Sequence, residues 1–154
     1  MKQDFGSYSG ILGQLSIPDA QGVKDPVTQM SHAAALLMES LPDISWAGFY
    51  RRSGKNLLIG PYQGEMHNSL CPAGVGIAGK AAGEMKTQLI PDVRILSDYV
   101  IEEDETESAA AVPFRYGKRH AAVLYLESRK KGRFSEADRK GLEEFAEILS
   151  EKIS

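Results

Sequence analysis

The chain has 154 residues, of which 42% are hydrophobic and 25% charged, and its formal net charge is -3 at pH 7. These values are ordinary for one globular domain and offer no basic face of the kind that nucleic-acid-binding proteins need. No apolar run approaches the roughly 18 residues of a membrane span, and the first residues carry no apolar signal-peptide core. A single cysteine excludes an intrachain disulfide, so we expect a cytoplasmic protein that binds neither nucleic acid nor membranes.

Residues 1–26 are set apart from the rest of the chain by their composition. They end in a turn-rich stretch, SIPDAQGVKDP, and we interpret them as an N-terminal extension to the core of a single domain at 27–153. Residues 27–40 then repeat apolar side chains at helical spacing, and Pro42 ends this predicted helix.

From residue 44 onward, the hydrophobic pattern predicts a series of short strands and two helices. In chain order they are strands at 44–51 and 57–62, a helix at 76–86, strands at 87–91, 109–116 and 119–127, and a final helix that begins after Ser135. The acidic stretch at 92–108 predicts a loop. Consecutive hairpins imply an antiparallel sheet, and we expect the terminal helices to cover one of its faces in an α+β layout.

Several blocks of the sequence carry a family resemblance. They are LPDISWAGFY at 41–50, LIGPYQG at 58–64, PAGVGIAGKAA at 72–82, IPDV at 90–93, VLYLES at 123–128 and RFSEADRKGLE at 133–143. Together these blocks resemble the free methionine-(R)-sulfoxide reductases, which are GAF domains. The resemblance implies a GAF-like α+β fold, with a central antiparallel sheet of about six strands flanked by helices. It also implies a homodimer formed through terminal helices.

The same resemblance indicates where the family's thiols would lie. Its cysteine positions correspond by register to Asn68, Ala78 and Glu102, so no family thiol is retained. Sulfoxide reduction needs a thiolate nucleophile and usually a second thiol that resolves the oxidised first one. Cys71 is the one candidate for a relocated nucleophile, and the alternative is that Cys71 is a small buried apolar residue.

The resemblance also implies a ligand pocket. The family's carboxylates that would face a substrate ammonium group correspond to Ala109, Tyr125 and Glu127 of this chain. Two of these three residues are not carboxylates, which weakens the anchoring of a cation. Trp46 and Tyr50 match the family's aromatic pocket wall and share one face of a strand. Glu127 is either the one remaining anchor for a polar ligand or a surface residue at a strand end, because burying it unpaired is costly. We expect a pocket under the loop at 94–108 that is walled by Trp46, Tyr50, Leu70, Tyr99, Ala109, Tyr125 and Glu127.

Two patterns that suggest a cofactor or a metal are weak. The GVGIAG segment at 74–79 spells a GxGxxG motif, but hairpins flank it where a dinucleotide site needs a βαβ unit. We interpret it as a tight turn into a helix whose N–H groups favour a small anion or a ligand oxygen atom. His32, His67 and His120 are scattered without the spacing of metal ligands, so we expect neither a metal nor a cofactor.

These observations favour a small-molecule-binding or sensing domain without catalytic activity. We expect a small polar ligand, a homodimer and a partner protein that receives the signal. One alternative is a reductase-like oxidoreductase with altered or residual activity that uses Cys71 and an external thiol. Another is a domain whose pocket is filled by side chains and which acts only through protein contacts, although the alanines at 109–111 argue against a filled cavity.

Overall fold

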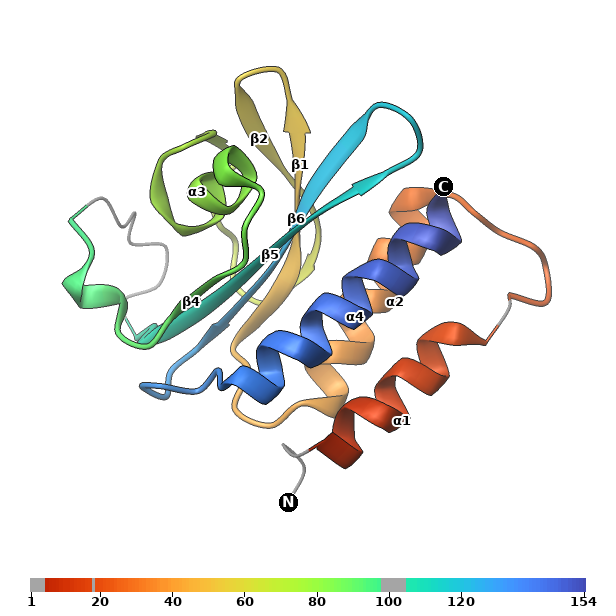
Figure 1. Ribbon diagram of the computed structural model, residues 1–154, viewed down its shortest axis with the longest axis horizontal. Coiled ribbons are helices and arrows are strands. Elements are labelled where there is room, and N and C mark those ends of the chain that lie inside the picture. Colours follow the sequence, from red (N-terminus) through yellow and green to blue (C-terminus); the bar gives the residue numbers. More distant parts are fainter. Residues whose placement is uncertain (1–4, 18, 98–104) are drawn as a thin grey trace.

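The computed structural model describes residues 5–17, 19–97 and 105–154, in which the strands form one antiparallel sheet (Figure 1). The strands are β1 (Trp46–Ser53), β2 (Asn56–Gln63), β3 (Leu70–Pro72), β4 (Gln88–Ile90), β5 (Ser108–Tyr116) and β6 (His120–Ser128), in the spatial order β3-β2-β1-β6-β5-β4. The helices are α1 (Phe5–Ser16), α2 (Pro26–Ser40), α3 (Gly76–Glu84) and α4 (Glu136–Ile153), and a short 3₁₀ helix, η1, spans Val93–Ile95. The predicted α+β fold with a six-stranded antiparallel sheet is confirmed.

The sheet separates two hydrophobic cores. Helices α1, α2 and α4 cover one face, and α3 lies on the opposite face with the loops around it (Figure 1). Because successive side chains of a strand point to opposite faces, Leu124 and Leu126 of β6 enter the core beneath the three helices, whereas Val123 and Tyr125 enter the core beneath α3. The residues predicted to wall a pocket lie on the α3 side wherever the structure describes them.

The predicted helices and strands are present with small shifts at their ends, but three elements were not predicted: α1, β3 and η1, which lies in the stretch predicted as a loop. Helix α2 begins where expected because Asp25 caps it, accepting a hydrogen bond from the Thr28 amide at 3.0 Å. Strand β3 has only 3 residues, too few for a periodic pattern. Helix α1 lies inside the segment interpreted as an extension, and the glycines in its sequence lower its helix propensity.

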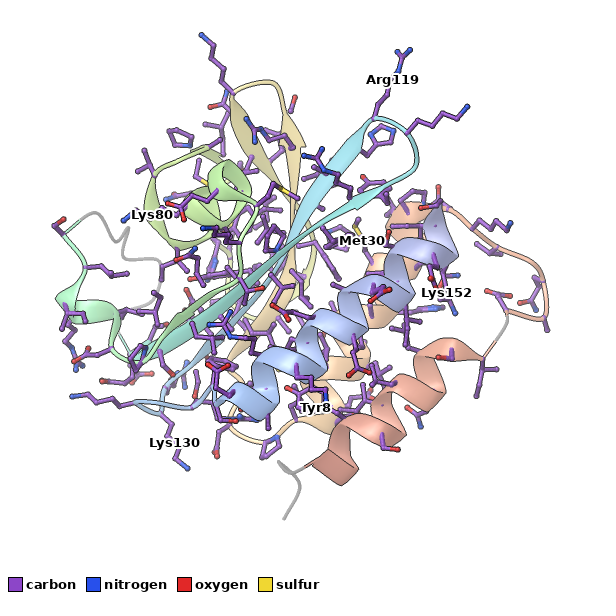
Figure 2. The ribbon with its side chains drawn as sticks, in the orientation of Figure 1. Tyr8, Met30, Lys80, Arg119, Lys130 and Lys152 are labelled. Carbon is purple, nitrogen blue, oxygen red and sulfur yellow. The ribbon has the colours of Figure 1, made fainter. Side chains whose placement is uncertain are left out.

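Helix α1 is held against α4 by a buried polar contact as well as by apolar packing. Tyr8, Ile11 and Leu15 are at most 5% exposed and join the core formed with α2 and α4. The Tyr8 hydroxyl donates to Oδ1 of Asp138 at 2.9 Å, and Figure 2 shows Tyr8 between the two helices. Lys152 of α4 donates to the Leu15 carbonyl at 2.8 Å, near the end of α1. Helix α1 therefore shares one hydrophobic core with α2 and α4.

Candidate functional site

A cavity of about 120 Å³, which we call the outer cavity, opens on the α3 side of the sheet between the start of α3 and strand β3. Leu70 and Cys71 of β3 form one wall, together with Asn68 from the loop before it. The first turn of α3 forms the opposite wall. Tyr50 and Tyr125 line the cavity and also contact the buried side chains beneath it. The outer cavity thus combines apolar walls with hydroxyl, amide and thiol groups.

The glycine-rich segment before α3 forms the tight turn predicted from its sequence. Gly74 and Gly76 have φ angles of +91° and +75°, in the region that residues with a side chain rarely adopt. Val75, the N-cap of α3, provides no side-chain hydrogen bond to the first turn. The helix therefore presents backbone N–H groups and the positive end of its dipole to the cavity wall, a setting that suits an anion or a ligand oxygen atom.

Beneath the outer cavity, aromatic rings surround the fully buried side chain of Trp46. Tyr50 and Tyr62 stack on the indole with centroids 6.0 and 5.1 Å away, and Tyr125 meets it edge-on at 5.7 Å. His67 is the closest of these rings, parallel to the indole within 6° and with centroids 4.3 Å apart. These contacts place the imidazole of His67 at the centre of the α3-side core.

Glu127 is fully buried beside His67, so its interpretation as a surface residue at a strand end is wrong. Its carboxylate accepts hydrogen bonds from the hydroxyls of Tyr125 at 2.6 Å and Thr106 at 3.0 Å. The imidazole Nε2 of His67 lies 3.6 Å from Oε1 of Glu127, and Nδ1 lies 3.2 Å from the Tyr50 hydroxyl. With Tyr50 donating to Nδ1, we infer that the neutral ring carries its proton on Nε2, facing Glu127.

The structure brings most of the predicted pocket residues together. The residues that converge, each at most 5% exposed, are Trp46, Tyr50, Ala109, Tyr125 and Glu127. Leu70 lies apart from them, 49% exposed, in the wall of the outer cavity. Tyr99 and Glu102, and the middle of the loop predicted to cover the pocket, lie outside the described residues.

The sequence analysis missed His67, which occupies space beside Trp46 and Glu127. In the sequence, His67 is one of three histidines that lack the spacing of metal ligands. His67 lies in the loop between β2 and β3, where neither helical nor strand periodicity applies. The alanines of β5 favour an open pocket, but they give no information on a side chain that fills this pocket from a different part of the chain.

Cys71 lies on β3, is partly buried and packs against the α3-side core, so the interpretation of Cys71 as a buried apolar residue is confirmed only in part. It lines the outer cavity together with Asn68 and Ala78, two positions that the family resemblance assigns to cysteines. Asn68 and Ala78 therefore line the same outer cavity as Cys71, the one thiol of the chain.

Burial makes protonation of His67 unfavourable and predicts a pH-dependent stability. It lowers the pKa of His67 from 6.5 to about 4, so the imidazole is neutral in the folded protein at pH 7. The unfolded chain binds this proton below pH of about 6.5, so acid favours unfolding and stability is lost as the pH falls through that value. Between pH 7 and 5, we expect the wild type to lose about 2 kcal/mol more free energy of unfolding than His67→Gln in urea titrations.

The exposed His32, replaced by glutamine in the same way, is the matched control for this pH experiment. Its replacement removes an imidazole that lies outside the α3-side core, so an effect common to both variants is not specific to His67. Identical losses in the wild type and His67→Gln would show that His67 does not carry a buried, neutral ring.

Two other kinds of feature are absent from the part of the chain that the structure describes. No group of three or more histidine, cysteine, aspartate or glutamate side chains could hold a metal ion there. No helix there combines the length and apolar character of a membrane span.

Residues 25–154 match the model of a protein family described as GAF domain. The chain belongs to the GAF domain family. Protein YtsP of Bacillus subtilis is 33% identical to this GAF domain over 149 residues, which cover 96% of this chain and 91% of YtsP. The free methionine-R-sulfoxide reductase of Escherichia coli is 30% identical over 125 residues, which cover 81% of this chain and 76% of the reductase.

Solved structures agree with this assignment. The structure of the reduced form of fRMsr of Staphylococcus aureus superimposes on the GAF domain with a TM-score of 0.89. The sequence identity is 26%, and the match covers 96% of this chain and 95% of the Staphylococcus protein. The predicted GAF-like fold and the predicted resemblance to free methionine sulfoxide reductases are therefore confirmed.

Proposed function

We propose that this GAF domain binds a small polar molecule in the outer cavity without reducing it. The observation that carries the proposal is the composition of the cavity wall, where Asn68 and Ala78 stand at family cysteine positions and Cys71 is the only thiol. A cavity that lacks a pair of thiols suits binding better than two-electron reduction.

The electron count supports this proposal. Reduction of a sulfoxide to a sulfide needs two electrons and two protons, which two thiols supply when they become a disulfide and water is released. Cys71 alone can supply both electrons only by becoming a sulfenic acid, and the chain has no second thiol that could reduce this acid again. A complete cycle with this chain needs external thiols.

The size and polarity of the cavity indicate the kind of ligand. About 120 Å³ is well below the volume of pockets for drug-sized ligands. The Asn68 amide and the N-terminus of α3 favour a ligand that carries oxygen atoms, whereas the Tyr50 and Tyr125 hydroxyls already donate to His67 and Glu127. A small oxygen-bearing metabolite, with an apolar part against Leu70 and Ile77, meets these conditions.

The first experiment measures turnover and binding with one ligand, free methionine-(R)-sulfoxide. Turnover is followed with thioredoxin or glutathione as the electron donor, for the wild type and Cys71→Ser. Binding is followed by the rate at which iodoacetamide alkylates Cys71, the only thiol of the chain. We expect no turnover in either protein and slower alkylation in the presence of the ligand. The matched control is Ala78→Leu, which fills the cavity and should abolish the protection.

Each outcome of this experiment has a defined meaning. Turnover that disappears in Cys71→Ser would overturn the proposal and establish a relocated nucleophile. Alkylation that the ligand does not slow at any concentration would exclude this ligand from the outer cavity.

The second candidate function is a reductase that uses Cys71, and the position of this thiol in the cavity wall favours it. The thiolate would attack the sulfoxide sulfur, and the oxygen would then pass from that sulfur to the sulfur of Cys71 and take up a proton from water. The sulfoxide S–O bond breaks, the sulfide leaves, and Cys71 becomes a sulfenic acid. An external thiol would then form a mixed disulfide with release of water, and a second external thiol would regenerate Cys71. A homodimer and a partner protein that receives a binding signal remain parts of the first proposal.

A further inference from the structure

Strand β5 is covered along its outer edge over only part of its length. Strand β4 pairs with residues 109–111, whereas β5 itself continues to Tyr116. Beyond β4, a groove of about 640 Å³, which we call the edge groove, lies between this outer edge and helix α4. Its walls include residues 113–115 of β5 and, on α4, Ala146 and Glu147. The edge groove shares no lining residue with the outer cavity.

Two backbone groups of β5 face the edge groove without a partner. Alternate residues of a strand direct their N–H and C=O groups to the same edge. Two serines of α4 show which residues these are, because Ser150 donates to the Arg115 carbonyl and Ser154 accepts from the Gly117 amide at 3.0 Å. Pro113 belongs to the same alternation. Its carbonyl and the N–H of Arg115 therefore point outward, and neither is bonded to another of the described residues.

This carbonyl and this N–H match one direction of strand addition. In a parallel pair, one residue of the added strand donates to the carbonyl before the residue beside it and accepts from the N–H after that residue. One residue placed beside Phe114 can therefore bond both Pro113 and Arg115. An antiparallel strand would direct a carbonyl at Pro113, which has no N–H, and an N–H at the Arg115 carbonyl, which Ser150 already occupies. Parallel addition leaves neither group unpaired.

Charges of opposite sign line the two sides of the edge groove. Lys86 and Arg115 lie on the side of the sheet, and Glu147 lies on α4. All three are exposed, and none forms an ion pair with another of the described residues. Arg139 and Glu143 also line the groove, but they lie 4.0 Å from each other and compensate each other's charge. The groove therefore offers two cations and one carboxylate to a bound molecule.

The faces of the sheet determine how a bound strand would meet these charges. Phe114 belongs to the core beneath the three helices, and the side chain of Arg115, the next residue, points to the opposite face. A residue bonded beside Phe114 places its own side chain on the face of α4, near Glu147. The residues before and after it place theirs on the face of Arg115. A basic residue between two acidic residues is thus complementary to the groove.

We propose that the edge groove binds an extended segment of a partner protein, which runs parallel to β5 and carries a basic residue between two acidic residues. The backbone of the basic residue bonds Pro113 and Arg115, and its side chain approaches Glu147. The acidic neighbours approach Arg115 and Lys86. Main-chain hydrogen bonds supply affinity and the alternating side chains supply specificity, as in other strand additions to a sheet edge. This inference goes beyond the proposed function and does not require that the outer cavity bind anything.

The test uses the wild-type protein, with the acetylated and amidated peptide Thr-Glu-Lys-Glu-Thr as the probe. Proton–nitrogen correlation spectra are recorded while the peptide is added up to millimolar concentrations. We expect a saturable shift of the Arg115 amide signal and slower hydrogen exchange of this N–H. A paramagnetic label at the N-terminal end of the peptide should broaden the signals near Thr87, and a label at the C-terminal end those near Ser150.

Matched controls separate strand addition from unspecific attraction. A peptide methylated on the backbone nitrogen of its lysine lacks the donor to Pro113 and should bind roughly fivefold more weakly or worse. Arg115→Glu should weaken binding of the unmodified peptide roughly threefold or more. Arg119→Glu makes the same change of charge in the turn between β5 and β6, where Figure 2 shows the side chain pointing away from the rest of the molecule. This variant should bind like the wild type.

Every outcome of the titration decides the proposal. An Arg115 amide signal that does not shift at any peptide concentration would overturn it. Equal binding of the methylated peptide would overturn the backbone pairing, and labels that broaden the opposite ends of the groove would overturn the parallel direction. A shift that follows the protein concentration without peptide would show that a second copy occupies the groove instead. Alkylation of Cys71 reports the outer cavity alone, so the failure of the proposed function is recognised separately.

Discussion

We expect Asp138→Ala to lower the free energy of unfolding by about 3–5 kcal/mol, measured by urea denaturation at pH 7. Asp138 is 2% exposed, and its Oδ2 accepts hydrogen bonds from Arg133 at 3.1 Å and from the Ser135 amide at 2.8 Å. Its Oδ1 accepts from Tyr8. Removing the carboxylate leaves the guanidinium of Arg133, 5% exposed, as a buried charge without this counterion.

Two milder variants are the controls for Asp138→Ala. Tyr8→Phe removes one hydrogen bond and should cost about 1 kcal/mol. Burial and the charge of Asp138 raise the pKa of Tyr8, so its hydroxyl remains a donor at neutral pH. Ser135→Ala removes the hydroxyl that accepts from the Asp138 amide and donates to Oδ2 of Asp138, and it should also cost about 1 kcal/mol. If Asp138→Ala costs no more than either control, the buried pair with Arg133 does not stabilise the fold.

Trp46→Ala should destabilise the protein by about 3–5 kcal/mol, because it leaves a large void in the α3-side core. Trp46 is fully buried, and His67 and Tyr62 stack on it with centroids 4.3 and 5.1 Å away. The effect is measured by circular dichroism during urea unfolding, since this variant has lost the only tryptophan. The loss should extend to the outer cavity, because Tyr50 and Tyr125 both contact Trp46 and line that cavity.

Trp46→Phe is the matched control, because it keeps an aromatic ring and removes the indole donor to the Glu65 carbonyl. We expect it to cost about 1–2 kcal/mol, the value of one hydrogen bond and a modest loss of packing. Equal costs for Trp46→Ala and Trp46→Phe would contradict the stacked arrangement of these rings.

Elements with local signals could be predicted from the sequence. The apolar repeat at 27–40 and the capping of α4 by Ser135 depend on residues within a few positions, and the structure shows both, including a capping box with Asp138. Helix α1 could not be predicted in this way. The glycines at 10 and 13 oppose a helix locally, and only packing against α2 and α4 stabilises it.

The candidate site was predicted in part, for a similar reason. Trp46 and Tyr50 share a face by strand periodicity, so their approach to the residues of β6 follows from the sheet. Glu127 also lies on this face, but its burial depends on Thr106, which is 21 positions away in the sequence. His67 contacts Glu127 from a loop 60 positions earlier, and no local pattern carries such a contact. Polar contacts that loops make with distant parts of the chain can therefore be identified only from the folded structure.

Because side chains alternate along β6, neighbouring residues of this strand pack into different cores. Leu124 and Leu126 pack under the helices, whereas Tyr125 and Glu127 face the α3 side. A substitution at 125 or 127 can therefore change the α3-side core while the helix-facing half of the molecule keeps its packing. Libraries that vary the α3-facing positions of β5 and β6, and keep Trp46 of β1, should yield proteins in which the core beneath the three helices is intact, because the sheet separates the two cores.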